Sequence, residues 1–149
     1  MKIALGSDEK THLTDHLITE LEKRGHTLTL FGPLTETDTY WPAVAQQVAE
    51  AVITNQADEG IILCWTGTGV TIAANKLPGI RAALCDDAET ARGARLWNNA
   101  NVLTLSLRRT TPIIASEILD AWFAHTYQPN ETDDTCLGQL ATIEEKYRA

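Results

Sequence analysis

The stretch that most constrains the fold runs from residue 60 to residue 76 and reads GIILCWTGTGVTIAANK. Its first residues, 60–63, form a short apolar run typical of a buried parallel strand, and residues 70–76 predict a helix that packs back against it. Cys64 therefore stands at the carboxyl end of the strand, the edge at which open α/β sheets bind ligands. Backbone amides that open a helix stabilise a nearby anion, and so favour the thiolate form of such a cysteine. Cys64 is thus a candidate base or nucleophile.

The rest of the chain alternates between short apolar runs and amphipathic segments. The expected strands are residues 2–6, 27–31, 60–63, 81–85 and 102–106, and the expected helices are residues 14–24, 42–54, 70–76, 87–96 and 112–125. This alternation, joined by right-handed crossovers, predicts parallel strands covered by helices on both faces. The predicted fold class is α/β, a Rossmann-like three-layer sandwich with a five-stranded parallel sheet.

The composition changes after Tyr127. A polar, acidic segment, QPNETDDTC, is followed by residues 137–147, which could form an amphipathic helix. In a single globule this helix has no obvious sheet face left to cover, and a loosely ordered tail is the alternative. We therefore divide the chain into a Rossmann-like domain, residues 1–127, and a C-terminal tail and helix, residues 128–149.

The composition argues against several classes of partner. A chain of 149 residues with 44% hydrophobic residues can bury the core of one domain. The net charge of −8 argues against nucleic acid and anionic membranes as partners. No signal-like or membrane-length apolar run is evident, so we expect a cytoplasmic protein. Cys64, Cys85 and Cys136 are too few and too scattered for a disulfide framework or a zinc site. We expect no metal and no cofactor, and a core position for Cys85.

Several short motifs follow one another along the chain. They are Gly6-Ser7-Asp8, Trp41-Pro42, ILCWTGTGVTIAANKLPGIRAAL from Ile62, Asn-Asn-Ala-Asn-Val-Leu from Asn98, and Arg108. In this order they resemble the sugar-phosphate isomerase family that includes type B ribose-5-phosphate isomerase and galactose-6-phosphate isomerase. The resemblance covers roughly residues 1–125. It implies an enzyme that interconverts aldoses and ketoses by proton transfer through an enediolate.

The resemblance also assigns catalytic roles. Cys64 would be the base, and the Thr66 hydroxyl would donate a hydrogen bond to the enediolate oxygen. Asp8 would hold sugar hydroxyls, and Asn98 would assist the developing charge. Further donors would be the amides from Gly67 through Thr68 and Gly69 to Val70. Read from the residues alone, Asp8 could simply cap its loop and Asn98 could be a turn residue.

Partners follow from the same resemblance. Family members pair as dimers whose C-terminal helix reaches the partner subunit. We therefore expect a homodimer, or a tetramer, in which residues 128–149 contact the partner. The expected ligand is a small sugar or sugar phosphate.

Four positions depart from the family pattern. Glu9 replaces a histidine that contacts phosphate, Trp97 replaces the ring-opening histidine, and Trp65 replaces a glycine. Acidic residues in the segment 130–134 stand where phosphate-binding arginines are expected. Each lost charge-assisted hydrogen bond removes about 1.5–3 kcal/mol, so we expect altered substrate specificity.

The remaining aromatic and cationic residues suggest how the pocket differs from the family pattern. Together with Trp41, the two new tryptophans are expected to line the pocket as substrate-binding residues, because sugar C–H faces stack on indole. Candidate cations are Lys10, Arg92, Arg95, Arg108 and Arg109, of which Arg95 and Arg108 match family positions. An open-chain substrate, such as a four-carbon ketose or its phosphate, needs no ring-opening acid. The alternative function is a non-catalytic family member that binds a small sugar or polyol or acts as a structural partner.

Overall fold

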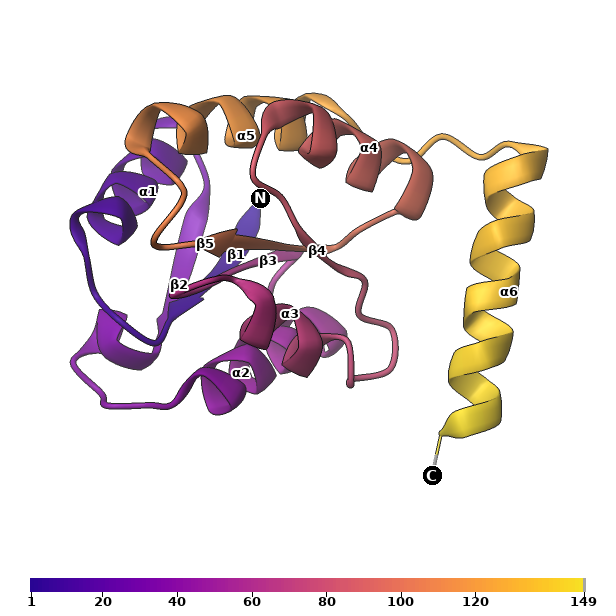
Figure 1. The fold of residues 1–149 in the computed structure, drawn as a ribbon, viewed down its shortest axis with the longest axis horizontal. Coiled ribbons are helices and arrows are strands. Elements are labelled where there is room, and N and C mark those ends of the chain that lie inside the picture. The colour runs from indigo at the N-terminus through magenta and orange to yellow at the C-terminus, as the bar shows by residue number, and fades with distance from the viewer. Residues whose placement is uncertain (149) are drawn as a thin grey trace.

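A five-stranded parallel sheet forms the middle layer of the molecule, whose residues 1–148 are described by a computed structural model (Figure 1). The strands are β1 (Lys2–Ser7), β2 (Thr27–Phe31), β3 (Glu59–Cys64), β4 (Ala82–Leu84) and β5 (Val102–Ser106). Their order across the sheet is β2-β1-β3-β5-β4. The order reverses direction at β1 and β3, which places a topological switch point at the carboxyl ends of these two strands.

Helices cover both faces of this sheet. They are α1 (His12–Lys23), α2 (Trp41–Ile53), α3 (Thr68–Ala74), α4 (Ala88–Asn98) and α5 (Pro112–Ala124), and a short 3-10 helix, η1 (Gly32–Thr35), precedes α2. In Figure 1, α1, α4 and α5 lie on one face, and α2 and α3 lie on the other. Because side chains alternate along a strand, β3 supplies both cores: Ile61 and Leu63 pack toward α1, α4 and α5, whereas Ile62 and Cys64 pack toward α2 and α3.

The predicted fold class is confirmed, with small errors at element ends. The helix after Cys64 begins at Thr68 rather than Val70, because Gly67 adopts a left-handed conformation and caps it. The strand predicted at residues 81–85 is shorter, Ala82–Leu84.

The last helix, α6 (Glu131–Tyr147), begins earlier than the predicted Leu137. The Asn130 side chain accepts a hydrogen bond from the amide of Asp133 at 2.9 Å and caps the helix. Acidic residues in the first turn complement the positive end of the helix dipole, so the polar segment is the start of the helix rather than a tail. Figure 1 shows α6 standing away from the sandwich, beyond β4, and none of its residues is buried.

Residues 1–148 contain neither a membrane-spanning helix nor a cluster of metal ligands. None of the helices in this part of the chain has the length and apolar character needed to cross a membrane. The same residues hold no group of three or more His, Cys, Asp or Glu side chains arranged to bind a metal ion.

Candidate active site

A cleft of about 280 Å³ lies at the carboxyl ends of β1 and β3. Its lining combines residues from three separate segments: Asp8, Trp41, and Cys64, Trp65, Thr66, Thr68 and Gly69. The parallel sheet brings them together, because β1 and β3 are hydrogen-bonded neighbours and end at the same edge. Seven of the residues selected from the sequence therefore share one site.

Cys64 is the last residue of β3 and is only 5% exposed. Its carbonyl accepts a hydrogen bond from the amide of Leu107 at 3.0 Å, which ties the end of β3 to the segment after β5. Because the side chain points toward α2 and α3, the small exposed part of the thiol lines the cleft. The sheet thus holds the thiol in a fixed position with a single open side.

The turn after Cys64 is fixed by its glycine. Gly67 has a φ of +77°, and a Cβ added there would lie 2.5 Å from Leu84 Cδ1 and 3.0 Å from the backbone of Leu105. The Thr71 hydroxyl donates to the Gly67 carbonyl at 2.6 Å, which anchors the same turn to α3. Only glycine meets both the conformational and the spatial requirement.

Two hydroxyls lie within this turn. Thr66 Oγ1 and Thr68 Oγ1 are hydrogen-bonded at 2.8 Å, and both residues are exposed at the cleft. The first amides of α3 have no acceptor within the helix. Val70, by contrast, is fully buried in the core, so that only its backbone is available to a ligand.

Asp8 follows β1 and is half-buried beside the cysteine in the cleft. Burial raises the pKa of Asp8, and the neighbouring Glu9 carboxylate adds to the rise. The loop is held by Ser7, whose hydroxyl donates to the Glu9 carbonyl at 2.6 Å and accepts from the Glu9 amide at 3.3 Å. Glu9 itself is exposed and does not line the cleft.

Two indoles line the cleft, and Arg108 follows in the chain at the same edge of the sheet. Trp41 lies against Gly69, where an added Cβ would be 3.2 Å from the ring, and Trp65 is 60% exposed. The Arg108 amide donates to the Trp65 carbonyl at 3.1 Å, so the exposed Arg108 follows directly at the same edge. Arg109 forms an ion pair with Asp86 at 3.5 Å.

Asn98 does not line this cleft. Helix α4 runs back along the sheet and ends at Asn98, just before β5 starts at Val102. Ser106, at the far end of β5, is the residue that pairs with Cys64. Four residue steps of about 3.3 Å separate Val102 from Ser106, so Asn98 is roughly 13 Å or more from Cys64, at the amino edge of the sheet.

Trp97 lies at the amino edge as well. Its indole packs on Gly93, where an added Cβ would lie 2.6 Å from Cζ3. The Arg92 guanidinium lies over the same ring, 5.4 Å from the centroid, and pairs with Glu89 at 2.6 Å. Trp97 is therefore a fixed, half-exposed indole, but it does not line the Cys64 cleft of its own chain.

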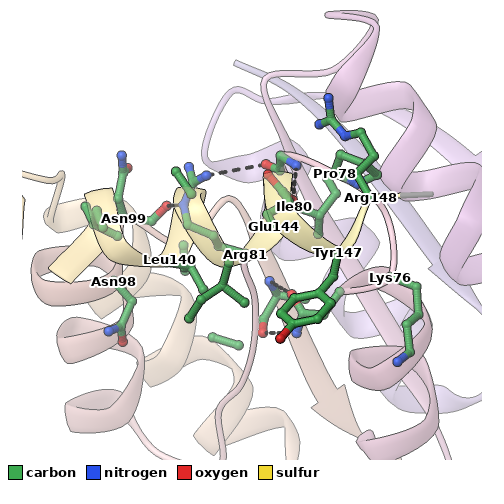
Figure 2. A pocket seen from close by; sticks show the side chains of 18 residues that line it. Lys76, Pro78, Ile80, Arg81, Asn98, Asn99, Leu140, Glu144, Tyr147 and Arg148 are labelled. Carbon is green, nitrogen blue, oxygen red and sulfur yellow. Dashed lines mark hydrogen bonds between the residues drawn. The ribbon is translucent and has the colours of Figure 1, made fainter.

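A larger groove occupies the amino side of the molecule, between α6 and the sandwich. Its volume is about 810 Å³, and Figure 2 shows Asn98, Asn99 and Arg81 beside side chains of α6 in its lining. Apolar side chains of α6 line it while staying exposed: Leu140 is 47%, Ile143 57% and Tyr147 73% exposed. One hydrogen bond crosses the groove: the Gly79 amide donates to Oε1 of Glu144 in α6 at 2.7 Å.

The expectation that Arg95 supplies a pocket cation is wrong. Arg95 is only 9% exposed and forms a buried ion pair with Glu59 at 2.6 Å, at the amino edge of the sheet. Sequence reasoning missed Glu59 as a partner. A carboxylate at the start of an otherwise wholly apolar strand requires a buried cation or donor, and that requirement was the available signal.

Comparisons with known proteins agree with this architecture. Residues 3–138 match the family model described as Ribose/Galactose Isomerase. A ribose-5-P isomerase B of Listeria innocua is 40% identical over 123 residues, covering 82% of this chain and 83% of the relative. A D-erythrulose-4-phosphate isomerase of Pectobacterium atrosepticum is 41% identical, with 82% of each chain covered. The structure of Clostridium thermocellum ribose-5-phosphate isomerase B superposes with a TM-score of 0.92 at 39% identity, covering 99% of this chain and 100% of the other. The resemblance inferred from the sequence is confirmed, and the chain belongs to the ribose/galactose isomerase family.

Proposed function

We propose that this protein interconverts a short open-chain ketose phosphate and its aldose by proton transfer at Cys64, and that ribose 5-phosphate is a poor substrate. The observation that carries this proposal is the cleft that joins Cys64, Asp8 and the Thr66–Thr68 hydroxyl pair. Its volume of about 280 Å³ lies just below the range typical of ligand pockets, about 300–1,000 Å³. A small substrate fits such a cleft better than a large one.

In the proposed mechanism, Cys64 removes a proton from the carbon beside the carbonyl and returns it to the neighbouring carbon. The Thr66 hydroxyl and the first amides of α3 donate hydrogen bonds to the enediolate oxygen as negative charge develops on it. The reaction also moves a proton between the two oxygens. Asp8 suits that transfer, because burial raises its pKa and its carboxylate lines the same cleft.

The positions that depart from the family pattern support a shortened substrate. A four-carbon ketose phosphate cannot close the ring that a pentose phosphate forms, so it requires no ring-opening acid at the position of Trp97. We assign the phosphate group to Arg108, because this residue is exposed and its amide is hydrogen-bonded to the carbonyl of Trp65, which lines the cleft. That a D-erythrulose-4-phosphate isomerase is 41% identical to this chain favours erythrulose 4-phosphate among the four-carbon candidates.

The proposal also assigns a role to the amino edge of the sheet, in contact with a second copy of the chain. Asn98 faces the groove beside α6, whose Leu140, Ile143 and Tyr147 are apolar and exposed in the single chain. Burying such side chains stabilises an association by roughly 25 cal/mol per Å² of apolar surface. We infer that a second copy fills this groove and brings its own Cys64 cleft to Asn98 and Trp97, in a homodimer or a tetramer.

A comparison of substrates tests the proposed function. Erythrulose 4-phosphate, ribose 5-phosphate and galactose 6-phosphate are assayed side by side, with Cys64→Ser as the matched control for background. We expect turnover of the four-carbon substrate, and efficiency on ribose 5-phosphate lower by on the order of a hundredfold or more, since two lost contacts remove about 1.5–3 kcal/mol each. Higher efficiency on ribose 5-phosphate would contradict the shortened substrate. Binding of sugars without turnover of any would favour the non-catalytic alternative.

A further inference from the structure

A buried polar cluster lies at the amino edge of the sheet, outside the cleft. Glu59 opens β3 and Arg95 lies in α4, and their Oε1 and Nη2 atoms are 2.6 Å apart. Glu59 is 5% exposed, Arg95 is 9% exposed, and Trp122 of α5 is fully buried against both. The Trp122 indole nitrogen donates to Glu59 Oε2 at 2.6 Å, and the Arg95 guanidinium lies over the indole, 4.9 Å from its centroid. Each oxygen of the Glu59 carboxylate therefore has a hydrogen-bond partner, and the Arg95 guanidinium also packs on the indole.

The Arg95 guanidinium donates two further hydrogen bonds, both to backbone carbonyls. Arg95 Nη1 donates to the Ala100 carbonyl at 2.5 Å, and Arg95 Nε donates to the His125 carbonyl at 3.2 Å. Ala100 lies in the turn between α4 and β5, and His125 is the residue at which α5 ends. One side chain therefore connects β3, the α4–β5 turn and the start of the segment that leads to α6.

The position of this cluster in the chain relates it to the proposed site. Asn98 is the last residue of α4, three residues after Arg95, and the Arg95 guanidinium holds the turn that follows at the Ala100 carbonyl. Within that turn Asn99 takes a left-handed conformation, with a φ of 45°, so the chain reverses direction directly after Asn98. The hydrogen bond from Arg95 to the His125 carbonyl holds the start of the segment that leads to α6. Arg95 thus holds the chain two residues after Asn98 and six residues before α6.

A stabilising role alone does not explain a buried ion pair, because apolar side chains of similar volume often give equal or greater stability. Apolar side chains cannot hold two carbonyls in fixed positions. We propose that Glu59 and Arg95 are positioning residues, which hold Asn98 and the approach to α6 in the geometry that meets the cleft of a second copy. This inference rests on the proposed role of Asn98.

A double-mutant cycle between Arg95 and Asn98 tests the inference. Arg95→Lys retains the charge but loses the fixed fork of donors. We expect it to lower kcat tenfold to a hundredfold, on the order expected for an ångström-scale misplacement, with a smaller effect on KM. In an Asn98→Ala background the same change is expected to have a much smaller further effect on kcat, because the part of its effect that passes through Asn98 is already lost and only the part through α6 remains. Equal losses in both backgrounds would overturn the inference and leave the proposed function standing.

Arg24→Lys is the matched control. Arg24 also joins two helices through its guanidinium, with Asp120 of α5 at 2.5 Å and Glu20 of α1 at 2.6 Å, but it has no connection to Asn98. We expect Arg24→Lys to leave kcat unchanged in both backgrounds. A coupling of Arg24 to Asn98 equal to that of Arg95 would overturn the inference.

Amide hydrogen exchange gives an answer that does not depend on turnover. In Arg95→Lys, faster exchange confined to residues 98–101 and 125–130 is expected, with the strands of the core unchanged. If the wild-type chain turns over no sugar phosphate, the proposed function fails and this measurement decides the positioning role. Unchanged exchange, or faster exchange throughout the chain, would overturn it.

Discussion

The two edges of the sheet differ in how complete they are within one chain. At the carboxyl edge, Asp8, Cys64 and Thr66 already share a cleft. At the amino edge, Asn98 lines a groove beside a helix whose apolar side chains remain exposed. The difference teaches that the carboxyl edge depends on short-range turn geometry, whereas the amino edge depends on contacts between residues far apart in the sequence.

The largest expected effect contrasts two cysteines of the carboxyl edge. Cys64→Ala should lower kcat by about 10²–10⁴-fold, the typical contribution of a general base, and leave the melting temperature nearly unchanged. Cys85 is the matched control: it is fully buried just beyond β4, and burial raises the pKa of its thiol to about 12. Cys85→Ala should leave kcat nearly unchanged. If Cys64→Ala kept the wild-type kcat, Cys64 would not be the base, and the carboxyl edge would not be the edge that supplies it.

A smaller effect contrasts two left-handed glycines. Gly67 in the carboxyl-edge turn has a φ of +77° and no room for a Cβ, whereas Gly25 in the α1–β2 turn has a φ of +81° and open space around it. Gly25→Ala should lower the free energy of unfolding by about 1–2 kcal/mol, the cost of the left-handed conformation. Gly67→Ala should cost about 1–3 kcal/mol more because of overpacking, and should also lower kcat. Denaturant titration measures both values, and equal losses would show that the turn is not held by close packing.

The smallest expected effect is a pH dependence of stability at the amino edge. His26 stacks on Phe123 with ring centroids 4.3 Å apart, and its Nδ1 is buried without a hydrogen-bond partner. Burial lowers the pKa of His26 below its ordinary value of 6.5, helped by the N-terminal charge and Arg24. Folding therefore favours the neutral ring, so stability is present above about pH 6.5 and decreases as the pH falls below that value.

A melting series between pH 7.5 and pH 5 measures this effect. The decrease should become smaller in His26→Phe, which keeps an aromatic ring but cannot titrate. His12→Phe, at an exposed position, should keep the wild-type profile. If the melting temperature of His26→Phe fell with pH as much as that of the wild type, the loss of stability in acid would come from other groups.

The fold and the carboxyl edge could be predicted from the sequence because their signals are local. Alternating apolar runs defined the strands, and the Thr-Gly-Thr-Gly turn placed Cys64 at a strand end. The amino edge could not be predicted in the same way. The positions of Trp97 and Asn98 depend on the direction of α4 relative to the sheet, and the role of Arg95 depends on its ion pair with Glu59, 36 residues earlier in the chain. The apolar pattern predicts too late a start for α6, because the Asn130 cap and the acidic first turn are polar and resemble a tail.

Subunit complementation tests the central claim, that the two edges meet as halves of one site between two copies. Cys64→Ala and Asn98→Ala chains, each with a lower kcat than the wild type, are unfolded together and refolded as a mixture. In a symmetric dimer, each mixed pair has one site with both residues intact, so the mixture should recover about a quarter of wild-type kcat. Sizing of each variant shows whether the association is retained. No recovery, with both variants folded and associated, would contradict the claim and return Asn98 to a structural role in its own chain.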